Sequence, residues 1–226
     1  MSARYAALIP AIDAAPFIAG VVQRTLETVP KLLVIDDGSS DDTGAVARTA
    51  GAEVISLPLN RGKGAALRLG FSELFRRGFD AVVTLDADGQ HLPEEIPKLL
   101  DGWRRGGDLV LGTRDHLFSE MGRLRRNSNR LSSRIISMAA GIRLRDIQTG
   151  FRLYTRPLIA TTGFPEPRFE AETAVVVRAV RRKFSIVSVP IRLGFADGLA
   201  TSHYRPVVDS IRIAGAVVRA RFEPIR

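Results

Sequence analysis

Two short apolar runs that stop at aspartates place the strongest constraint on the fold of this chain. The runs and the acids that end them are Leu32–Ile35 before Asp36 and Asp37, and Ala81–Leu85 before Asp86 and Asp88. Both runs are apolar on both faces, which is typical of strands covered by helices on each side of a sheet. Ligands of open α/β sheets bind outside the carboxyl ends of the strands. We therefore expect the four aspartates to converge on one crevice.

The first half of the chain alternates apolar runs with amphipathic stretches, the pattern of strand and helix units in a mainly parallel sheet. Further strands are predicted at Tyr5–Ile9, Glu53–Leu57 and Leu109–Leu111. Helices are predicted near Ile18–Thr28, Thr43–Ala50, Ala65–Arg77 and Glu94–Arg104. Asp41 or Asp42 is expected to cap the second of these helices. With 226 residues and no linker-like segment, we expect a single α/β domain over residues 1–226.

The basic charge of the chain lies in its second half. Residues 1–113 carry 12 Lys+Arg against 15 Asp+Glu, whereas residues 114–226 carry 21 against 9. This half suits a phosphate-bearing partner such as a nucleotide diphosphate or an anionic membrane surface, although a solvated arginine-rich surface is an open alternative. A nucleic acid partner is not expected, because no helix-turn-helix pattern or aromatic-rich basic strand accompanies the charge.

The absence of cysteine excludes disulfides and thiolate metal sites, so a metal would need oxygen or imidazole ligands. No apolar stretch is long enough to span a bilayer. We expect a cytoplasmic protein that is soluble or peripheral at the cytoplasmic face of the membrane.

Two stretches of the second half combine an apolar stripe with arginines. One runs from Arg123 to Ala140, and the other places Val208, Ile211 and Val218 on one side of a helix while Arg205, Arg212 and Arg219 recur every seven residues. Each helix would either lie on a membrane surface or bury its apolar stripe in the core, and the sequence leaves both open.

The motif Asp86-Ala87-Asp88 is a candidate metal site. Carboxylates separated by one residue point the same way at an extended strand end, which suits one divalent cation. Mg²⁺ and Mn²⁺ take one or two carboxylates with phosphate and water, as in a metal that bridges a nucleotide diphosphate. Gln90 is a candidate third ligand through its carbonyl oxygen. His91 is either a further ligand or a turn residue, and the turn is the favoured interpretation. Alone the motif is a weak signal, because paired aspartates also end strands or cap helices.

Two further segments carry groups suited to a nucleotide. The turn Asp36-Asp37-Gly38 places carboxylates where they can accept hydrogen bonds from a base or ribose. Asn60-Arg61-Gly62-Lys63-Gly64 is a basic loop before a helix, so its backbone N–H groups and Lys63 are predicted to face a phosphate. The loop lacks Walker A spacing, and no G-x-G-x-x-G follows the first strand, which weighs against an NTPase or a dinucleotide-dependent oxidoreductase.

Taken in order, these motifs resemble those of family 2 glycosyltransferases with the GT-A fold, in particular the dolichol-phosphate mannose synthase and polyprenyl-phosphate glucosyltransferase group. The resemblance covers nearly the whole chain. It rests on Ile9-Pro10-Ala11, Val34 to Ser39, Asn60 to Gly64, Leu85 to His91, Gly112-Thr113-Arg114, Asp146 to Arg152 and Ser202-His203-Tyr204-Arg205. It implies an open, mainly parallel sheet with a nucleotide-sugar half (1–113) and a less regular acceptor and phosphate half (114–226).

The resemblance also implies roles for individual residues. Pro10 and Asp37 would line the nucleoside pocket, Lys63 would lie near the donor, and Asp86, Asp88 and Gln90 would hold Mg²⁺ or Mn²⁺. Phosphate-binding roles are implied for Arg114, Arg126 and the segment from His203 to Arg205.

The chain departs from the family pattern after the first-strand proline. Family members have an aromatic residue and an amide followed by acids, whereas this chain reads Ile12-Asp13-Ala14-Ala15. Asp13 can still accept hydrogen bonds, but base stacking by a tyrosine is lost, which leaves the donor open. The family's bacterial members commonly carry C-terminal membrane helices, and the chain resembles the shorter, peripheral members. Its arginine-flanked helices or a membrane partner subunit would then hold it at the surface.

The implied reaction is inverting transfer of a hexose from a GDP-mannose or UDP-glucose type donor to an acceptor, expected to be a polyprenyl phosphate. The metal and the arginines would stabilise the leaving nucleoside diphosphate. An ionised phosphate acceptor needs little help from a base. Asp146 is the candidate base if one is needed, or else a buried acid paired with Arg145 or Arg152. The expected catalytic residues are Asp88, Arg114, Arg126 and Asp146.

Glu170 and Glu172 lie at the start of a helical stretch. They either face the acceptor or are acids that the helix dipole stabilises at that position, and they are not assigned as catalytic. Two other functions stay open: a sugar nucleotidyltransferase, and a non-catalytic subunit that binds a nucleotide sugar.

Overall fold

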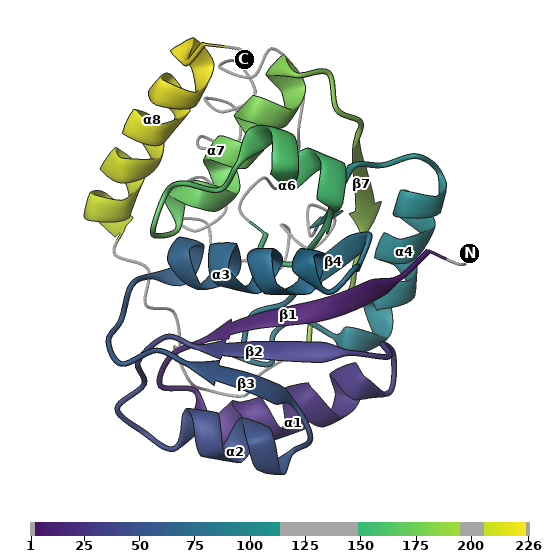
Figure 1. Cartoon of the computed structure of the whole chain (residues 1–226), viewed down its shortest axis with the longest axis vertical. Helices are drawn as coiled ribbons and strands as arrows, with labels where there is room; N and C mark the ends of the chain where they lie inside the picture. Colours follow the sequence, from purple (N-terminus) through teal and green to yellow (C-terminus); the bar gives the residue numbers. More distant parts are fainter. Residues whose placement is uncertain (1–2, 114–148, 195–205, 225–226) are drawn as a thin grey trace.

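A computed structural model describes residues 3–113, 149–194 and 206–224 of the chain (Figure 1). Within these residues, the strands form a seven-stranded sheet in the order β3-β2-β1-β4-β6-β5-β7. The strands are β1 (Tyr5–Ala11), β2 (Leu32–Asp36), β3 (Glu53–Ser56), β4 (Ala81–Thr84), β5 (Leu109–Thr113), β6 (Arg152–Thr155) and β7 (Ile186–Pro190). All pairings are parallel except those of β6, which runs antiparallel to both β4 and β5. The predicted open, mainly parallel α/β sheet is confirmed.

Helices cover both faces of this sheet (Figure 1). They are α1 (Ala15–Leu26), α2 (Thr43–Thr49), α3 (Lys63–Arg76), α4 (Ile96–Arg104) after a short 3₁₀ turn (Pro93–Glu95), α6 (Arg156–Thr162), α7 (Glu170–Arg181) and α8 (Pro206–Phe222). Alternate strand residues enter two separate cores, because successive side chains of a strand point to opposite faces. Ala6 and Leu8 of β1 pack with α3, α7 and α8, whereas Ala7 and Ile9 pack with α1, α2 and α4.

Helix α3 lies very close to β1 at Gly70. A Cβ atom at this position would come within 2.2 Å of Cδ1 of Leu8, so a side chain there would have to displace either the buried Leu8 side chain or the helix. This close packing fixes the position of α3, whose first residue is Lys63.

The strands and helices predicted in the first half are all present, with small differences at their ends. The largest is in α1, which begins at Ala15 rather than Ile18. Strand β1 runs to Ala11 rather than Ile9 because Pro10 and Ala11 pair with Ile35 and Asp36 of β2. Asp41, rather than Asp42, accepts a hydrogen bond from the Thr43 N–H at the start of α2 (2.9 Å).

The described part of the second half is more regular than expected. Strands β6 and β7 complete the same sheet, and α7 packs along α8. A buried arginine joins these two helices. Arg178 donates to Glu166 (2.5 and 2.9 Å) and to Glu223 just beyond α8 (3.0 Å). The predicted amphipathic stretch Arg123–Ala140 lies outside the described residues.

Candidate active site

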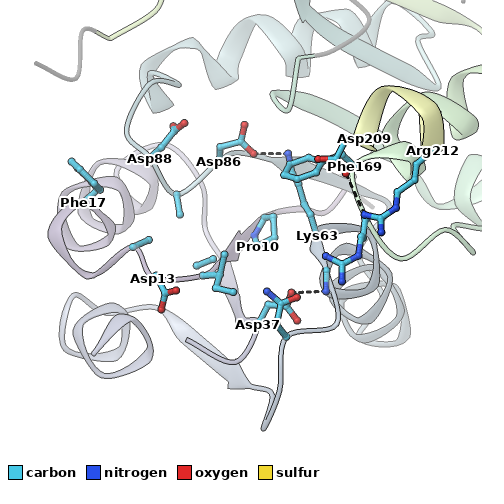
Figure 2. A pocket seen from close by; sticks show the side chains of 17 residues that line it. Pro10, Asp13, Phe17, Asp37, Lys63, Asp86, Asp88, Phe169, Asp209 and Arg212 are labelled. Atoms are coloured by element: carbon cyan, nitrogen blue, oxygen red, sulfur yellow. Dashed lines mark hydrogen bonds and ion pairs between the residues drawn. The ribbon is translucent and has the colours of Figure 1, made fainter. Parts of the chain in front are cut away.

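A cavity of about 560 Å³ opens at the carboxyl ends of β1, β2 and β4 (Figure 2). Its lining combines the ends of these strands with the start of α1, the start of α3, the segment before α7 and the first turns of α8. Those residues are Pro10–Ala14, Phe17, Asp37, Asn60, Gly62, Lys63, Asp86–Asp88, Arg168, Phe169, Asp209 and Arg212. Asp37, Asp86 and Asp88 thus meet as predicted. Asp36 does not line the cavity, because its buried carboxylate accepts the Ser39 N–H instead (3.1 Å).

Asp37 organises the basic loop rather than standing free. Its two carboxylate oxygens accept the backbone N–H groups of Arg61 (2.8 Å) and Gly62 (2.7 Å). Gly62 has a φ of +94°, a conformation that favours glycine. The Ala65 N–H donates to the Pro167 carbonyl (2.9 Å). The prediction that the N–H groups of this loop face a phosphate is therefore wrong for Arg61 and Gly62, whose N–H groups already have partners within the protein.

Asp13 holds two loops together at the mouth of the cavity. Its carboxylate accepts hydrogen bonds from the N–H (2.8 Å) and the hydroxyl (3.0 Å) of Ser40. Its own N–H donates to the Ser39 hydroxyl (3.0 Å). Asp13 therefore shapes the mouth of the cavity as well as lining it.

Lys63 lies at the centre of the charge arrangement. Its ammonium is 2.6 Å from Oδ1 of Asp86 and 2.9 Å from Oε2 of Glu172, and its side chain is 16% exposed. Burial by itself lowers the pKa of Lys63, but the carboxylates of Asp86 and Glu172 outweigh burial and raise that pKa well above its ordinary value. Lys63 is therefore a permanent cation in contact with the first aspartate of the candidate metal motif.

Several contacts hold the loop from Asp86 to His91 in place. The Asp86 N–H donates to Nδ1 of the buried His91 (3.1 Å), and the His91 ring stacks on Phe151 at 5.3 Å. The Gln90 N–H donates to Oδ1 of Asp88 (3.0 Å). The histidine supports the loop from a buried position, and its backbone pairs with Leu193 rather than forming the predicted turn.

Two acids at the start of α7 are buried behind the cavity. Glu172 reaches Lys63 through Oε2. Within the part of the chain that the structure describes, neither Oε1 of Glu172 nor Oε2 of Glu170 has a hydrogen-bond partner. A buried carboxylate oxygen without a partner is costly, which favours a functional reason for its position. Sequence reasoning left both glutamates unassigned, and Glu172 belongs to the charged centre of the site.

Four of the side chains that line the cavity were not predicted from the sequence: Phe17 of α1, Arg168 and Phe169 before α7, and Asp209 of α8. Figure 2 shows Phe17 and Asp13 on one side of the cavity and Phe169, Asp209 and Arg212 on the other. Arg212 donates to the buried Asp209 (3.3 Å). Arg212 was noted only as part of the arginine stripe. The cavity thus offers two aromatic rings and two guanidinium groups around the acidic centre.

The predicted site residues divide into two groups. Pro10, Asp13, Asp37, Lys63, Asp86 and Asp88 line one cavity, and Gln90 is next to it without lining it. The expected phosphate and base residues lie outside the described residues; they are Arg114, Arg126, Asp146, His203 and Arg205. The alternative partner of Asp146, Arg152, is buried and donates to the carbonyls of Thr149 (2.7 Å) and Glu172.

The donor atoms of the cavity fit a divalent cation that also needs phosphate. Asp86 and Asp88 supply carboxylate oxygens. No cluster of three or more metal-ligating side chains occurs in residues 3–113, 149–194 and 206–224. Mg²⁺ and Mn²⁺ bound by only one or two carboxylates complete their coordination with phosphate and water. The Lys63 ammonium against Asp86 marks the position as one that attracts positive charge.

Comparison of the whole chain with known proteins places this architecture among GT-A glycosyltransferases. A crystal structure of glucosyl-3-phosphoglycerate synthase from Mycobacterium tuberculosis, in complex with Mn²⁺, uridine diphosphate and phosphoglyceric acid, superposes with a TM-score of 0.79. The match covers 99% of this chain and 80% of that one, at 20% sequence identity, and therefore concerns the fold. Residues 6–163 match the glycosyl transferase family 2 model. The chain belongs to this family and is a glycosyltransferase.

Two curated relatives are similar along most of the chain. Polyprenol monophosphomannose synthase of Mycolicibacterium smegmatis is 32% identical over 195 residues, covering 78% of this chain and 71% of the relative. Undecaprenyl-phosphate mannosyltransferase of Micrococcus luteus is 31% identical over 201 residues, covering 83% and 82%. Among the helices of the described residues, none has the length and apolar character that a membrane crossing requires.

Proposed function

We propose that this protein transfers a hexose from a nucleotide-diphosphate sugar to a polyprenyl phosphate, with Mg²⁺ or Mn²⁺ held by Asp86 and Asp88. The observation that carries the proposal is the contact of Lys63 with Asp86 and Glu172 in a cavity that Asp88 also lines. The names of the M. smegmatis and M. luteus relatives support the acceptor. A donor of the GDP-mannose or UDP-glucose type fits the family.

The nucleoside is assigned to the side of the cavity that Pro10, Asp13 and Phe17 line. The Asp13 carboxylate accepts from Ser40 and keeps lone pairs for a ribose hydroxyl or a base N–H. Phe17 offers an aromatic face for the base. This ring stands in for the tyrosine that the chain lacks after Pro10.

The diphosphate is assigned to the centre of the cavity. When bound, the metal supplies positive charge for the leaving group. The Lys63 ammonium adds to this charge, and Glu172 and Asp86 fix its position before the donor arrives. Charges that are already in place need no reorganisation as the leaving group becomes negative, which is how preorganised sites lower barriers.

In the chemical step, an oxygen of the acceptor phosphate attacks the anomeric carbon. The bond from that carbon to the diphosphate oxygen breaks, and the electron pair leaves with the nucleoside diphosphate. Attack from the opposite face inverts the configuration. Arg168 and Arg212 both line the cavity, and Arg212 lies on the side away from Phe17 (Figure 2). We assign these two guanidinium groups to the acceptor phosphate. Arg114, Arg126, Asp146, His203 and Arg205 stay predicted participants.

The test is a transfer assay with GDP-mannose and UDP-glucose, each with polyprenyl phosphate or phosphoglycerate, in Mg²⁺, Mn²⁺ or EDTA, with products resolved by mass. The expected result is a glycosyl polyprenyl phosphate that forms only with metal. Asp88→Asn should reduce the rate at least about a hundredfold, whereas Asp101→Asn, an exposed aspartate on α4, should leave it unchanged. Transfer that EDTA does not affect, or transfer to phosphoglycerate alone, would contradict the proposal.

A further inference from the structure

Helix α8 is apolar on two opposite faces, and one of them is exposed. Ile213, Ala216, Val217 and Ala220 are buried, as expected for the face packed on α7. On the outer side, Val208 (43%), Ile211 (67%), Val218 (57%) and Phe222 (78%) are exposed. Their spacing of three, seven and four residues places them on one stripe of a helix with 3.6 residues per turn. The alternative that Val208, Ile211 and Val218 form ordinary core is therefore wrong.

The exposed stripe has basic borders. At helical spacing, Arg212 and Arg219 lie along one edge and Arg221 lies along the other. The acid of this helix, Asp209, is buried with an exposed side-chain fraction of 5%. The outer face of α8 therefore presents apolar side chains between positive charges, with no negative charge from the helix itself.

We propose that this stripe, consisting of Val208, Ile211, Val218 and Phe222, docks on the surface of an anionic lipid membrane. An apolar face flanked by arginines matches the acyl boundary and the anionic headgroups of such a membrane. A second copy of the chain fits less well, because pairing this face with itself would bring the arginines of both copies together. Figure 1 shows α8 at the edge of the molecule, with α7 on its inner side.

The same helix borders the active site. Asp209 and Arg212 line the cavity from the first turns of α8, next to Val208 and Ile211. A protein that rests on a membrane through the stripe would hold the mouth of its cavity beside the lipid headgroups. Docking through this surface would bring the cavity to the lipid that carries the acceptor phosphate. The role of the surface therefore rests on the proposed function. The binding itself does not require glycosyl transfer.

The experiment is flotation of the purified protein with vesicles of phosphatidylcholine, with or without phosphatidylglycerol. No nucleotide sugar and no polyprenyl phosphate are present, so the result does not depend on catalysis. We expect binding to the anionic vesicles and little binding to the neutral ones. Each arginine near an anionic surface contributes about fivefold to partitioning, so the double variant Arg219→Gln/Arg221→Gln should bind roughly 25-fold more weakly.

The apolar contribution is tested by the double variant Ile211→Ser/Val218→Ser, which should lower vesicle binding by at least about tenfold. Both positions are exposed, so an unchanged unfolding temperature is expected and is measured in parallel. The control is Leu59→Ser, which removes another exposed side chain (74%) outside the helix and should leave binding unchanged.

Three results would overturn the proposal: no flotation of the unsubstituted protein, equal binding of the Ile211→Ser/Val218→Ser variant, or equal loss in Leu59→Ser. A dimer in sedimentation that this double variant dissociates would instead assign the stripe to contacts between copies. Vesicle binding without any transfer to polyprenyl phosphate would contradict the proposed function and leave the docking surface intact.

Discussion

Lys63→Met is expected to destabilise the fold and to make its stability depend on divalent cations. The substitution keeps the length of the side chain but removes the ammonium that contacts Asp86 at 2.6 Å and Glu172 at 2.9 Å. Two carboxylates would then share a poorly solvated site, since the side chains of Asp86 and Glu172 are 29% and 8% exposed. Like charges in such a site repel each other, and Glu172 would lose the cation that contacts its carboxylate.

The magnitude follows from the burial of the two acids. Removing one partner of a buried ion pair costs about 3–5 kcal/mol, and the partial exposure of Asp86 reduces this to roughly 2–4 kcal/mol. For a chain of this size, each kcal/mol shifts the unfolding temperature by about 2–4 °C, so a decrease of roughly 4–16 °C is expected. The raised pKa of Lys63 means that its stabilisation is fully present below the ordinary value of 10.5 and is lost only as the pH rises through the higher folded value. The loss in the variant should therefore be similar from about pH 6 to pH 9.

The assay is thermal unfolding followed by circular dichroism in EDTA and in Mn²⁺. Mn²⁺ should recover a larger part of the stability in Lys63→Met than it adds to the unsubstituted protein, because the cation replaces the missing ammonium. The matched control is Lys31→Met, which removes a lysine 2.5 Å from Glu53 in a half-exposed pair and should cost less than about 1 kcal/mol with no response to Mn²⁺. Unchanged stability of Lys63→Met, or an equal Mn²⁺ response in both lysine variants, would refute the reasoning.

Three other substitutions test the nucleoside side, the buried acid and the packing of α3. Phe17→Ala should weaken nucleotide diphosphate binding by about five- to a hundredfold in calorimetry, as expected when stacking on a base is lost. Glu95 is buried, which raises its pKa, but hydrogen bonds from two cationic side chains outweigh burial and hold the pKa below its ordinary value of 4.5. Its stabilisation is present above that pH and is lost as the pH falls, so Glu95→Gln should cost about 1–3 kcal/mol near pH 7 in urea unfolding and progressively less at acid pH. Gly70→Ala should cost about 1–3 kcal/mol because its Cβ would meet Leu8, whereas Gly20→Ala, with open space around it in α1, should stabilise by about 0.5–1 kcal/mol.

Each of these substitutions has its own control. Phe222→Ala removes an exposed ring outside the cavity, and an equal loss of nucleotide binding there would count against stacking on Phe17. A cost for Glu95→Gln that stays constant down to acid pH would mean that the charge of Glu95 is not what stabilises the fold. Equal changes in the free energy of unfolding for Gly70→Ala and Gly20→Ala would mean that packing between α3 and β1 does not determine the cost of Gly70→Ala.

The sequence was most informative where local pattern and strand order determine the structure. The apolar runs before Asp37 and Asp86 predicted two buried strands, and the rule for strand carboxyl ends brought both acids to one cavity. Asp36 shows the limit of that rule. The side chains of adjacent residues in a strand point in opposite directions, so only one of two consecutive aspartates enters the cavity.

The residues that the second half adds to the sheet and to the candidate site are brought there by contacts between distant segments. A local sequence pattern does not predict such contacts. Strand β6 begins with the buried Arg152 and runs antiparallel between two strands of the first half, so it lacks the apolar run of β2. From the sequence alone, Glu172 is an ordinary acid at the start of a helix. In the structure its carboxylate lies 2.9 Å from the Lys63 ammonium. The residues directly after Pro10 do not predict Phe17, because its ring enters the cavity from the first turn of α1.

The contact between Lys63 and Asp86 also bears on the order in which ligands enter the site. A divalent cation arriving alone would place two positive charges beside an ammonium that already neutralises the first aspartate. A nucleotide diphosphate arriving alone would meet a lining in which the acids outnumber the three cations, Lys63, Arg168 and Arg212. Cation and diphosphate together nearly cancel in charge, so their joint entry leaves the pair of Lys63 and Glu172 undisturbed. We therefore expect metal and nucleotide to bind with positive cooperativity, and the Lys63→Met variant to lose part of that coupling because the metal alone would then bind more tightly.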